Sequence, residues 1–138
     1  MVTVENKVGR LIEVRQSGRV TIEELQGSFP LFQQILASKP GCFVMATDWR
    51  GMKLLDSETS EFLLSIMRAE NDRIQRQVIV IDPSAVMGLQ IRRLFKDAGG
   101  ETRAVFDGHR EAASWMEPSL TALEWDSYAR FMNPATAA

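Results

Sequence analysis

The sequence predicts an α/β protein with a mixed and mostly parallel sheet of about five strands covered by helices. Three short apolar runs carry this prediction, at residues 43–47, 78–81 and 103–106. Each is closed by turn residues and followed by a segment with helical spacing. A strand that is apolar at successive positions is typical of burial on both faces, and this alternation indicates parallel strands joined by right-handed crossovers. We therefore expect the three runs to be adjacent parallel strands.

Two further β segments precede these runs, at residues 2–4 and 10–15. In the second, apolar and polar side chains largely alternate, which is typical of a half-buried strand. Asn6-Lys7 is expected to form the turn between them, so that they add to one edge of the sheet.

The first helix begins at a capping box formed by Thr21 and Glu24. In this Thr-x-x-Glu pattern, side chains and backbone donors satisfy one another. Pro30 interrupts the apolar spacing and lacks a backbone donor. We therefore expect the helix to break or kink near residues 27–28 and to resume until about Ser38.

Apolar spacing predicts later helices from residue 58, from about 85 to 98, and over 109–116 and 120–132. In the helix over 85–98, the side chains expected to face inward are Val86, Leu89 or Gln90, Leu94 and Ala98. The last helix carries an aromatic stripe of Trp125, Tyr128 and Phe131. We expect this stripe to pack within the chain, with a homodimer contact as the alternative.

The chain is predicted to be one domain over residues 1–138. Its core covers about 8–117, and a helical extension over 119–132 and a tail at 133–138 follow it. No internal repeat or low-complexity linker divides the sequence.

The composition excludes several classes of function. Of the 138 residues, 45% are hydrophobic and 25% charged, and the formal net charge is −2. A nucleic-acid binder normally has a basic surplus, so we expect no nucleic-acid partner. No apolar stretch approaches the roughly 20 residues that span a bilayer, and the N-terminus lacks the apolar centre of a secretory signal. We expect no transmembrane segment and a cytoplasmic location.

Cys42 is the only cysteine of the chain. An intrachain disulfide and a cysteine-rich zinc site are therefore excluded. Because it stands at the start of a predicted buried strand, we expect an inert core thiol rather than a reactive one.

The junction after the middle strand is the strongest candidate for a site. A loop with Trp49 and Gly51 leads to a helix that starts at Asp56-Ser57, and either of these two residues can cap the helix. Open α/β sheets usually carry their sites at the carboxyl ends of strands. Any function encoded in this chain is therefore expected here.

Two short motifs resemble a known family. Leu54-Leu55-Asp56-Ser57 follows the middle strand and opens a helix, and the end of the core consists of residues 103–107 with residues 111–116. The first is similar to the Asp-Ser phosphoacceptor junction of the STAS superfamily, named for sulfate transporters and anti-sigma-factor antagonists. The second is similar to the last strand and helix of STAS-like proteins of the CRAL-TRIO-related branch. The antagonists usually follow Asp-Ser with Ser and Gly, whereas Glu58-Thr59 follow here.

The resemblance covers roughly residues 8–117 and implies a non-enzymatic regulatory module that binds a protein partner. Ser57 is the implied phosphoacceptor, and helix capping is its alternative role. The residues expected to contact the partner are Asp48, Trp49, Met52, Leu55, Asp56, Ser57 and Glu58. The apolar loop residues among them either fold over the sheet end or form an exposed patch or pocket mouth.

Catalysis has no positive signal in the sequence. Asp48, Asp82 and Asp107 follow the three core strands and could together bind magnesium, but Asp is also a common turn residue. His109 is the only histidine and has no visible catalytic partner. We expect no enzyme, no metal and no cofactor.

Two other features suggest different partners. Arg92, Arg93 and Lys96, with Arg73 and Arg76, form a basic patch that is either a solvated face or a contact for acidic proteins or lipid headgroups. The seven methionines and the CRAL-TRIO-like similarity favour the alternative function, which is carriage or sensing of a small apolar ligand or lipid. The weakest alternative is an enzyme that uses the strand-end aspartates.

Overall fold

A single five-stranded sheet forms the centre of the computed structural model, which describes residues 1–99 and 101–133. The strands are β1 (Val2–Val8), β2 (Leu11–Gln16), β3 (Phe43–Asp48), β4 (Ile74–Val80) and β5 (Arg103–Phe106). They lie side by side in chain order. β1 is antiparallel to β2, and every other pair is parallel. The predicted mixed sheet and the adjacency of its three core strands are confirmed.

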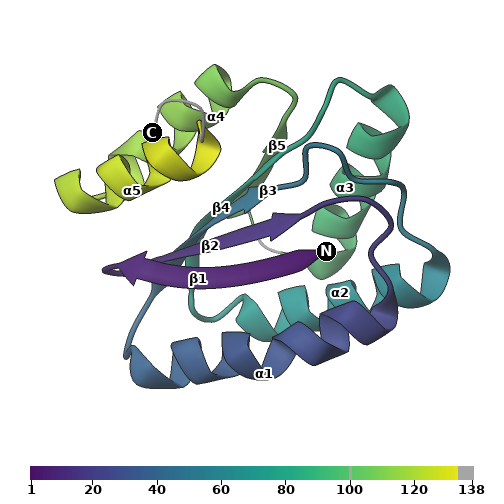
Figure 1. The fold of residues 1–138 in the computed structure, drawn as a ribbon, viewed down its shortest axis with the longest axis horizontal. Helices are drawn as coiled ribbons and strands as arrows, with labels where there is room; N and C mark the ends of the chain where they lie inside the picture. The colour runs from purple at the N-terminus through teal and green to yellow at the C-terminus, as the bar shows by residue number, and fades with distance from the viewer. Residues whose placement is uncertain (100, 134–138) are drawn as a thin grey trace.

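Helices cover both faces of this sheet (Figure 1). They are α1 (Ile22–Ser38), α2 (Ser57–Glu70), α3 (Ala85–Ala98), α4 (His109–Met116) and α5 (Ala122–Met132), with a short 3-10 helix at Glu117–Ser119. Each parallel connection adds the next strand on the same side, so right-handed crossovers place α1, α2 and α3 on one face. The other face is covered by α4 and α5.

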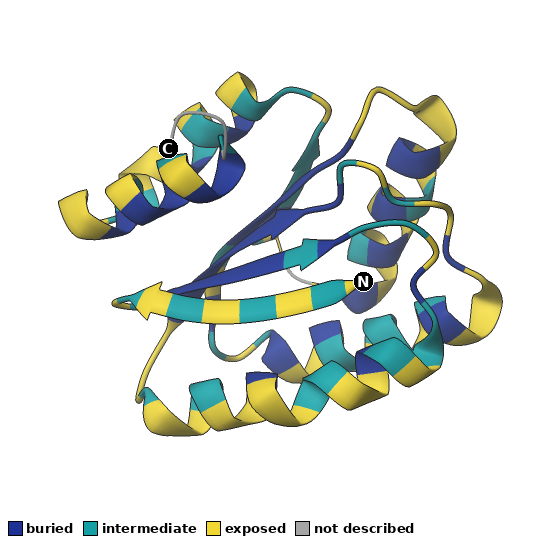
Figure 2. Ribbon diagram, viewed as in Figure 1, coloured by how far each residue is buried: buried dark blue, intermediate teal, exposed yellow. Residues whose placement is uncertain are grey.

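The core has two sides because successive side chains of a strand point to opposite faces. On β4, Val78 and Val80 pack with α4 and α5, whereas Ile79 packs with the helices of the other face. β3 is buried along its whole length, while β1 alternates between half-buried and exposed positions at the edge of the sheet (Figure 2). The apolar runs at residues 43–47 and 78–81 thus correspond to inner strands, whereas the run at 103–106 forms the edge strand β5, most of which is half-buried.

The N-terminal hairpin differs from the prediction. β1 continues to Val8 and the chain turns at Gly9 and Arg10, so the turn predicted at Asn6-Lys7 is wrong. The Asn6 side-chain amide donates to the carbonyls of Gly9 and Leu11, at 3.0 and 2.7 Å, and Gly9 has φ +55°. Asn6 therefore stabilises the turn from within the strand, and glycine supplies its left-handed conformation.

The predicted break in the first helix is also wrong, because α1 runs without interruption through Pro30. Proline removes the hydrogen bond to the carbonyl four residues earlier, which belongs to Gln26. Both Gln26 and Pro30 are exposed, so water can satisfy that carbonyl. The Thr21 hydroxyl caps the helix by accepting from Glu24 N–H at 3.2 Å, as the sequence predicted.

Cys42 is exposed, and its prediction as a core thiol is wrong. β3 begins one residue later, where Phe43 N–H donates to the carbonyl of Arg73. The preceding Gly41 has φ +86°, so the turn holds residue 42 outside the sheet.

The aromatic stripe of α5 packs against the sheet within the chain, as expected. Tyr128 and Phe131 are 1% and 9% exposed and pack with Leu11 of β2. Residues 134–138 of the expected tail lie outside the described residues. Among the residues that the structure describes, no helix is long and apolar enough to cross a membrane.

Candidate functional site

The loop between β3 and α2 is attached to its surroundings by backbone and side-chain hydrogen bonds. Gly18 N–H donates to the carbonyl of Gly51, and Lys53 N–H donates to the carbonyl of Gly18, both at 3.0 Å. Gly51 N–H donates to the Asp82 carboxylate at 2.6 Å. The loop is therefore held from two sides at the carboxyl edge of the sheet.

A third attachment comes from α3. The Gln90 side chain accepts from Leu55 N–H at 3.1 Å and donates to the carbonyl of Leu55 at 2.9 Å. One amide side chain thus satisfies both backbone groups of the residue before the helix cap.

Asp56 is the N-cap of α2, and its carboxylate accepts from Thr59 N–H at 2.8 Å. That hydrogen bond lowers the pKa of Asp56, with a smaller effect from the Thr59 side chain. Ser57 is the first residue of the helix and is exposed. Of the two capping residues that the sequence left open, Asp56 is correct, and Ser57 has no capping role.

A groove of about 480 Å³ lies beside Ser57, between α2 and α3. Its apolar wall includes Leu54, Val86 and Leu89, whose side chains are 49%, 59% and 65% exposed. Ser57 and Arg93 also line it. We call this feature the α2–α3 groove.

The exposure of Val86 and Leu89 corrects the prediction that Val86 faces inward with Leu89 or Gln90, and of these three only Gln90 is half-buried. α3 carries two apolar stripes, and the stripe with Met87, Ile91 and Leu94 is the buried one. Both stripes have helical spacing, so the sequence did not distinguish them. Sequence reasoning therefore missed the groove residues of α3.

The residues predicted to contact a partner divide into two groups. Asp48, Trp49 and Leu55 are 5%, 2% and 7% exposed, and Trp49 and Leu55 pack in the core over the sheet end. Met52 is half-buried, and Asp56, Ser57 and Glu58 are exposed. Only the second group can touch a partner in this conformation.

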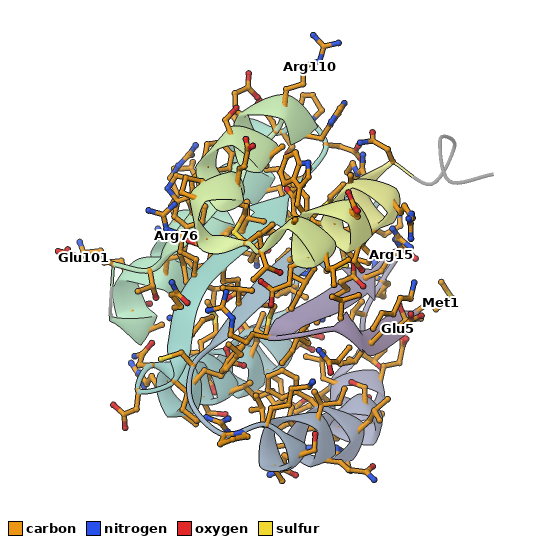
Figure 3. The ribbon with its side chains drawn as sticks, turned by 90° about the vertical axis from the view of Figure 1, so that its left-hand side faces the viewer. Met1, Glu5, Arg15, Arg76, Glu101 and Arg110 are labelled. Carbon is orange, nitrogen blue, oxygen red and sulfur yellow. The ribbon has the colours of Figure 1, made fainter. Side chains whose placement is uncertain are left out.

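Asp48 belongs to an ion cluster that holds α5. It pairs with Arg15 at 3.1 Å and with Arg50 at 2.9 Å. Burial raises its pKa, but the hydrogen bonds from both guanidinium groups outweigh burial and the pKa is lowered. Arg15 also donates to the carbonyl of Phe131, and Figure 3 shows it beside the end of α5. Arg50 donates to the carbonyl of Met132 at 2.6 Å.

The three strand-end aspartates therefore have separate environments. Asp48 binds two guanidinium groups, Asp82 accepts from the loop, and Asp107 is exposed. Within residues 1–99 and 101–133 there is no group of three His, Cys, Asp or Glu side chains that could hold a metal ion. His109 is the first residue of α4 and is half-buried.

The basic residues named in the sequence analysis also fall into two groups. Arg92, Arg93 and Lys96 are exposed on α3. Arg73 donates to the carbonyls of Leu36, Lys39 and Gly41, which end α1 and lead into β3. The guanidinium carbon of Arg76 lies 4.5 Å from the ring centre of Trp115, beside α4 (Figure 3). Arg73 and Arg76 thus stabilise the fold and do not extend the patch on α3.

A second cavity, of about 70 Å³ and partly open to solvent, lies between the sheet and helices α1 and α2. Most of its lining is apolar, and the polar exceptions are Gln16, Ser28, Thr47, Glu70 and Gln77. It is separate from the α2–α3 groove, with which it shares no lining residue.

No family model matches the sequence, and no curated protein does. Among solved structures, the fold is similar to that of an uncharacterized protein of the DUF3478 family from Shewanella loihica PV-4, described as having a SpoIIAA-like fold. The TM-score is 0.64 at 19% sequence identity, over 83% of this chain and 91% of the other. Identity this low shows the fold alone. The protein has the SpoIIAA-like, STAS-like fold that the two sequence motifs predicted.

Proposed function

We propose that this protein is a non-enzymatic regulatory module of STAS type that binds a protein partner through the α2–α3 groove and the adjoining start of α2. The observation that carries the proposal is the exposure of Leu54, Val86 and Leu89 around one groove beside Ser57. Three large apolar side chains exposed together at a concave site are typical of an interaction surface.

The polar residues around the groove give it specificity. Arg93 lies on its α3 side and Glu61 on its α2 side, and both line it. Arg92 and Lys96 extend the positive charge along α3, and Glu58 adds negative charge at the start of α2. Complementary charges fix the orientation of a partner and raise its association rate more than its affinity.

Ser57 is the proposed switch. Its side chain is exposed at the first position of α2 and lines the groove. Phosphorylation would place about two negative charges at the positive end of a helix, where the dipole tolerates them. A partner that covers Ser57 would then meet added charge and three new acceptor oxygens.

Affinity capture from a lysate of the native host tests the surface. Wild type is compared with Leu89→Glu, which places a charge in the groove, and with Leu123→Glu, which changes a leucine of similar exposure on α5. We expect a protein that wild type and Leu123→Glu retain and that Leu89→Glu loses. Equal retention by all three proteins would contradict binding at the groove.

The affinity of the partner identified in this way tests whether Ser57 is a switch. We expect phosphorylated Ser57 and Ser57→Asp to change its affinity at least tenfold, and Ser57→Ala to change it little. Asp is an imperfect mimic because phosphate carries more charge. If phosphorylated and unmodified protein bind equally, Ser57 is not a switch.

Carriage or sensing of a small apolar ligand is the second candidate function, and the cavity between the sheet and helices α1 and α2 favours it. A cavity of about 70 Å³ lined by aromatic, aliphatic and methionine side chains suits an apolar molecule. Native mass spectrometry of protein purified without organic additives tests this function. A retained small molecule supports carriage, and bare protein from the native host contradicts it.

A further inference from the structure

The cavity between the sheet and helices α1 and α2 has an apolar body. Leu63 of α2, Phe29 of α1, and Val14 and Ile79 of the sheet contribute to it. Val4 of β1 and Phe29 are half-buried on its outer side, where the edge strand meets α1. The cavity is partly open to solvent.

Two polar side chains that line the cavity, Thr47 and Gln77, are already hydrogen-bonded. The Gln77 amide donates to the Thr47 hydroxyl oxygen at 3.2 Å, and Arg103 donates to the Gln77 side-chain oxygen at 2.9 Å. Arg103 also donates to the Asn71 side chain at 2.7 Å and to the carbonyl of Met67 at 2.8 Å.

Glu70 is the exception in this network. Its side chain lines the cavity, the residue is 6% exposed, and it accepts a long hydrogen bond of 3.5 Å from Arg103. Burial raises the pKa of Glu70 to about 7, although the charge of Arg103 opposes that shift. A buried carboxyl group with so little hydrogen bonding is unfavourable unless another polar group reaches it.

Size and charge limit what can occupy the cavity. An apolar cavity of about 150 Å³ binds benzene in another protein, so side chains around a cavity of about 70 Å³ must repack to admit a molecule with a single ring. Met45 and Met67 line the cavity, and methionine adapts to irregular shapes. Glu70 and Arg103 already form an ion pair, which favours a neutral ligand over a charged one.

We propose that this cavity binds a small neutral molecule with an apolar body and one hydroxyl group, and that Glu70 hydrogen-bonds the hydroxyl. A hydroxyl serves either form of Glu70, because it donates to a carboxylate and accepts from a carboxylic acid. The inference rests on the second candidate function and names its ligand class. It does not depend on partner binding at the α2–α3 groove.

Phenol and toluene are the probes, since they differ by one hydroxyl group on the same ring size. Binding is followed by NMR chemical shifts of methyl groups that line the cavity. We expect saturable binding of phenol to wild type, at least tenfold tighter than binding of toluene.

Two neighbouring leucines of α2 provide a matched pair of variants that tests whether phenol binds in the cavity. Leu63 lines the cavity, whereas Leu64 lines the α2–α3 groove, and both are half-buried. Leu63→Trp fills the cavity and should abolish phenol binding, while Leu64→Trp should leave it unchanged. Equal phenol binding by the two variants would mean that phenol does not bind in the cavity.

Glu70 is tested by two substitutions. Glu70→Met should weaken phenol at least tenfold and leave toluene unchanged, and Glu70→Gln should retain phenol because an amide still offers hydrogen bonds. If Glu70→Met does not fold, the comparison of phenol with toluene in wild type decides the proposal.

The outcomes separate this inference from the function on which it rests. If toluene binds as tightly as phenol, the hydroxyl selectivity is overturned and carriage of an apolar ligand stands. If neither probe binds but native mass spectrometry finds a retained ligand that Leu63→Trp loses, the ligand class is overturned alone. If no probe binds and no ligand is retained, both fail.

Discussion

Gln90 of α3 holds both backbone polar groups of Leu55, accepting from its N–H at 3.1 Å and donating to its carbonyl at 2.9 Å. Leu55 directly precedes Asp56, which caps α2. One side chain thus connects α3 to the loop before the helix that carries Ser57. The walls of the α2–α3 groove are therefore attached to each other at the end where the proposed switch lies.

Replacing Gln90 with alanine should loosen this attachment locally. Leu55 N–H loses its acceptor, and we expect its hydrogen-exchange rate to rise at least tenfold. The free energy of unfolding should fall by only about 1 kcal/mol, since one typical hydrogen-bonding group is lost. Gln90→Glu is the control because it keeps an acceptor for Leu55 N–H. An unchanged exchange rate at Leu55 in Gln90→Ala would mean that other contacts hold the loop.

Asp56→Ala should lower the free energy of unfolding measurably, because the hydrogen bond to Thr59 N–H at the start of α2 is lost. Ser57→Ala is the matched control, and it should change stability by less than about 0.5 kcal/mol because Ser57 is exposed and does not cap. Urea unfolding measures both variants. A larger loss in Ser57→Ala than in Asp56→Ala would reverse the assignment of the cap.

Val80→Asp should prevent folding. Val80 is 1% exposed in β4, and an unpaired charge buried there costs several kcal/mol. Val86→Asp is the control, because Val86 is 59% exposed on α3 and should tolerate the change. Circular dichroism and thermal unfolding distinguish the two. A folded Val80→Asp protein with the melting temperature of wild type would be inconsistent with a central β4.

Asp48→Asn should weaken the docking of α5. Arg15 and Arg50 would lose their shared carboxylate while still donating to the last carbonyls of α5. Both guanidinium groups are about a third exposed, so we expect a loss of about 2 kcal/mol, less than for a fully buried pair. Asp126→Asn, at an exposed position of α5, is the control. Urea unfolding with limited proteolysis near residue 120 measures the effect, and identical curves for the two variants would refute it.

Stability should fall as pH rises between about 4.5 and 7. Burial raises the pKa of Glu70 from 4.5 to about 7 in the folded protein, so the folded state binds this proton more tightly than the unfolded chain. The resulting stabilisation is complete below pH 4.5 and is lost as pH rises through 7. Glu70→Gln removes the titrating group and should flatten this part of the curve of unfolding free energy against pH.

Glu13 is a second buried carboxyl group that should contribute to the same dependence of stability on pH. Burial also raises its pKa, against a hydrogen bond from Ser127, so it acts in the same direction. Glu13→Gln should therefore remove a further part of the slope, and the double variant should remove most of it. A slope that is unchanged in Glu70→Gln would show that Glu70 does not titrate in this range.

The sequence by itself determined the fold class and the places where helices begin. Continuous apolar runs such as residues 78–81 predicted inner strands, because only burial on both faces makes such a pattern favourable. Thr21 marked the start of α1, and Asp56 was one of two candidates for the start of α2. These signals are local, since a cap hydrogen bond and a strand's alternation involve residues a few positions apart.

The tertiary structure decided what is buried and what is exposed. On α3, Met87 and Val86 both belong to apolar stripes, and only packing against the sheet selected the stripe of Met87 for the core. Trp49 folded over the sheet end instead of reaching the surface. Glu70 and Arg103 are distant in sequence, yet they form a buried ion pair, and Glu70 lines a cavity under α1 and α2. Burial depends on which segments the fold brings together, and a pattern within one segment carries no information about its neighbours in space.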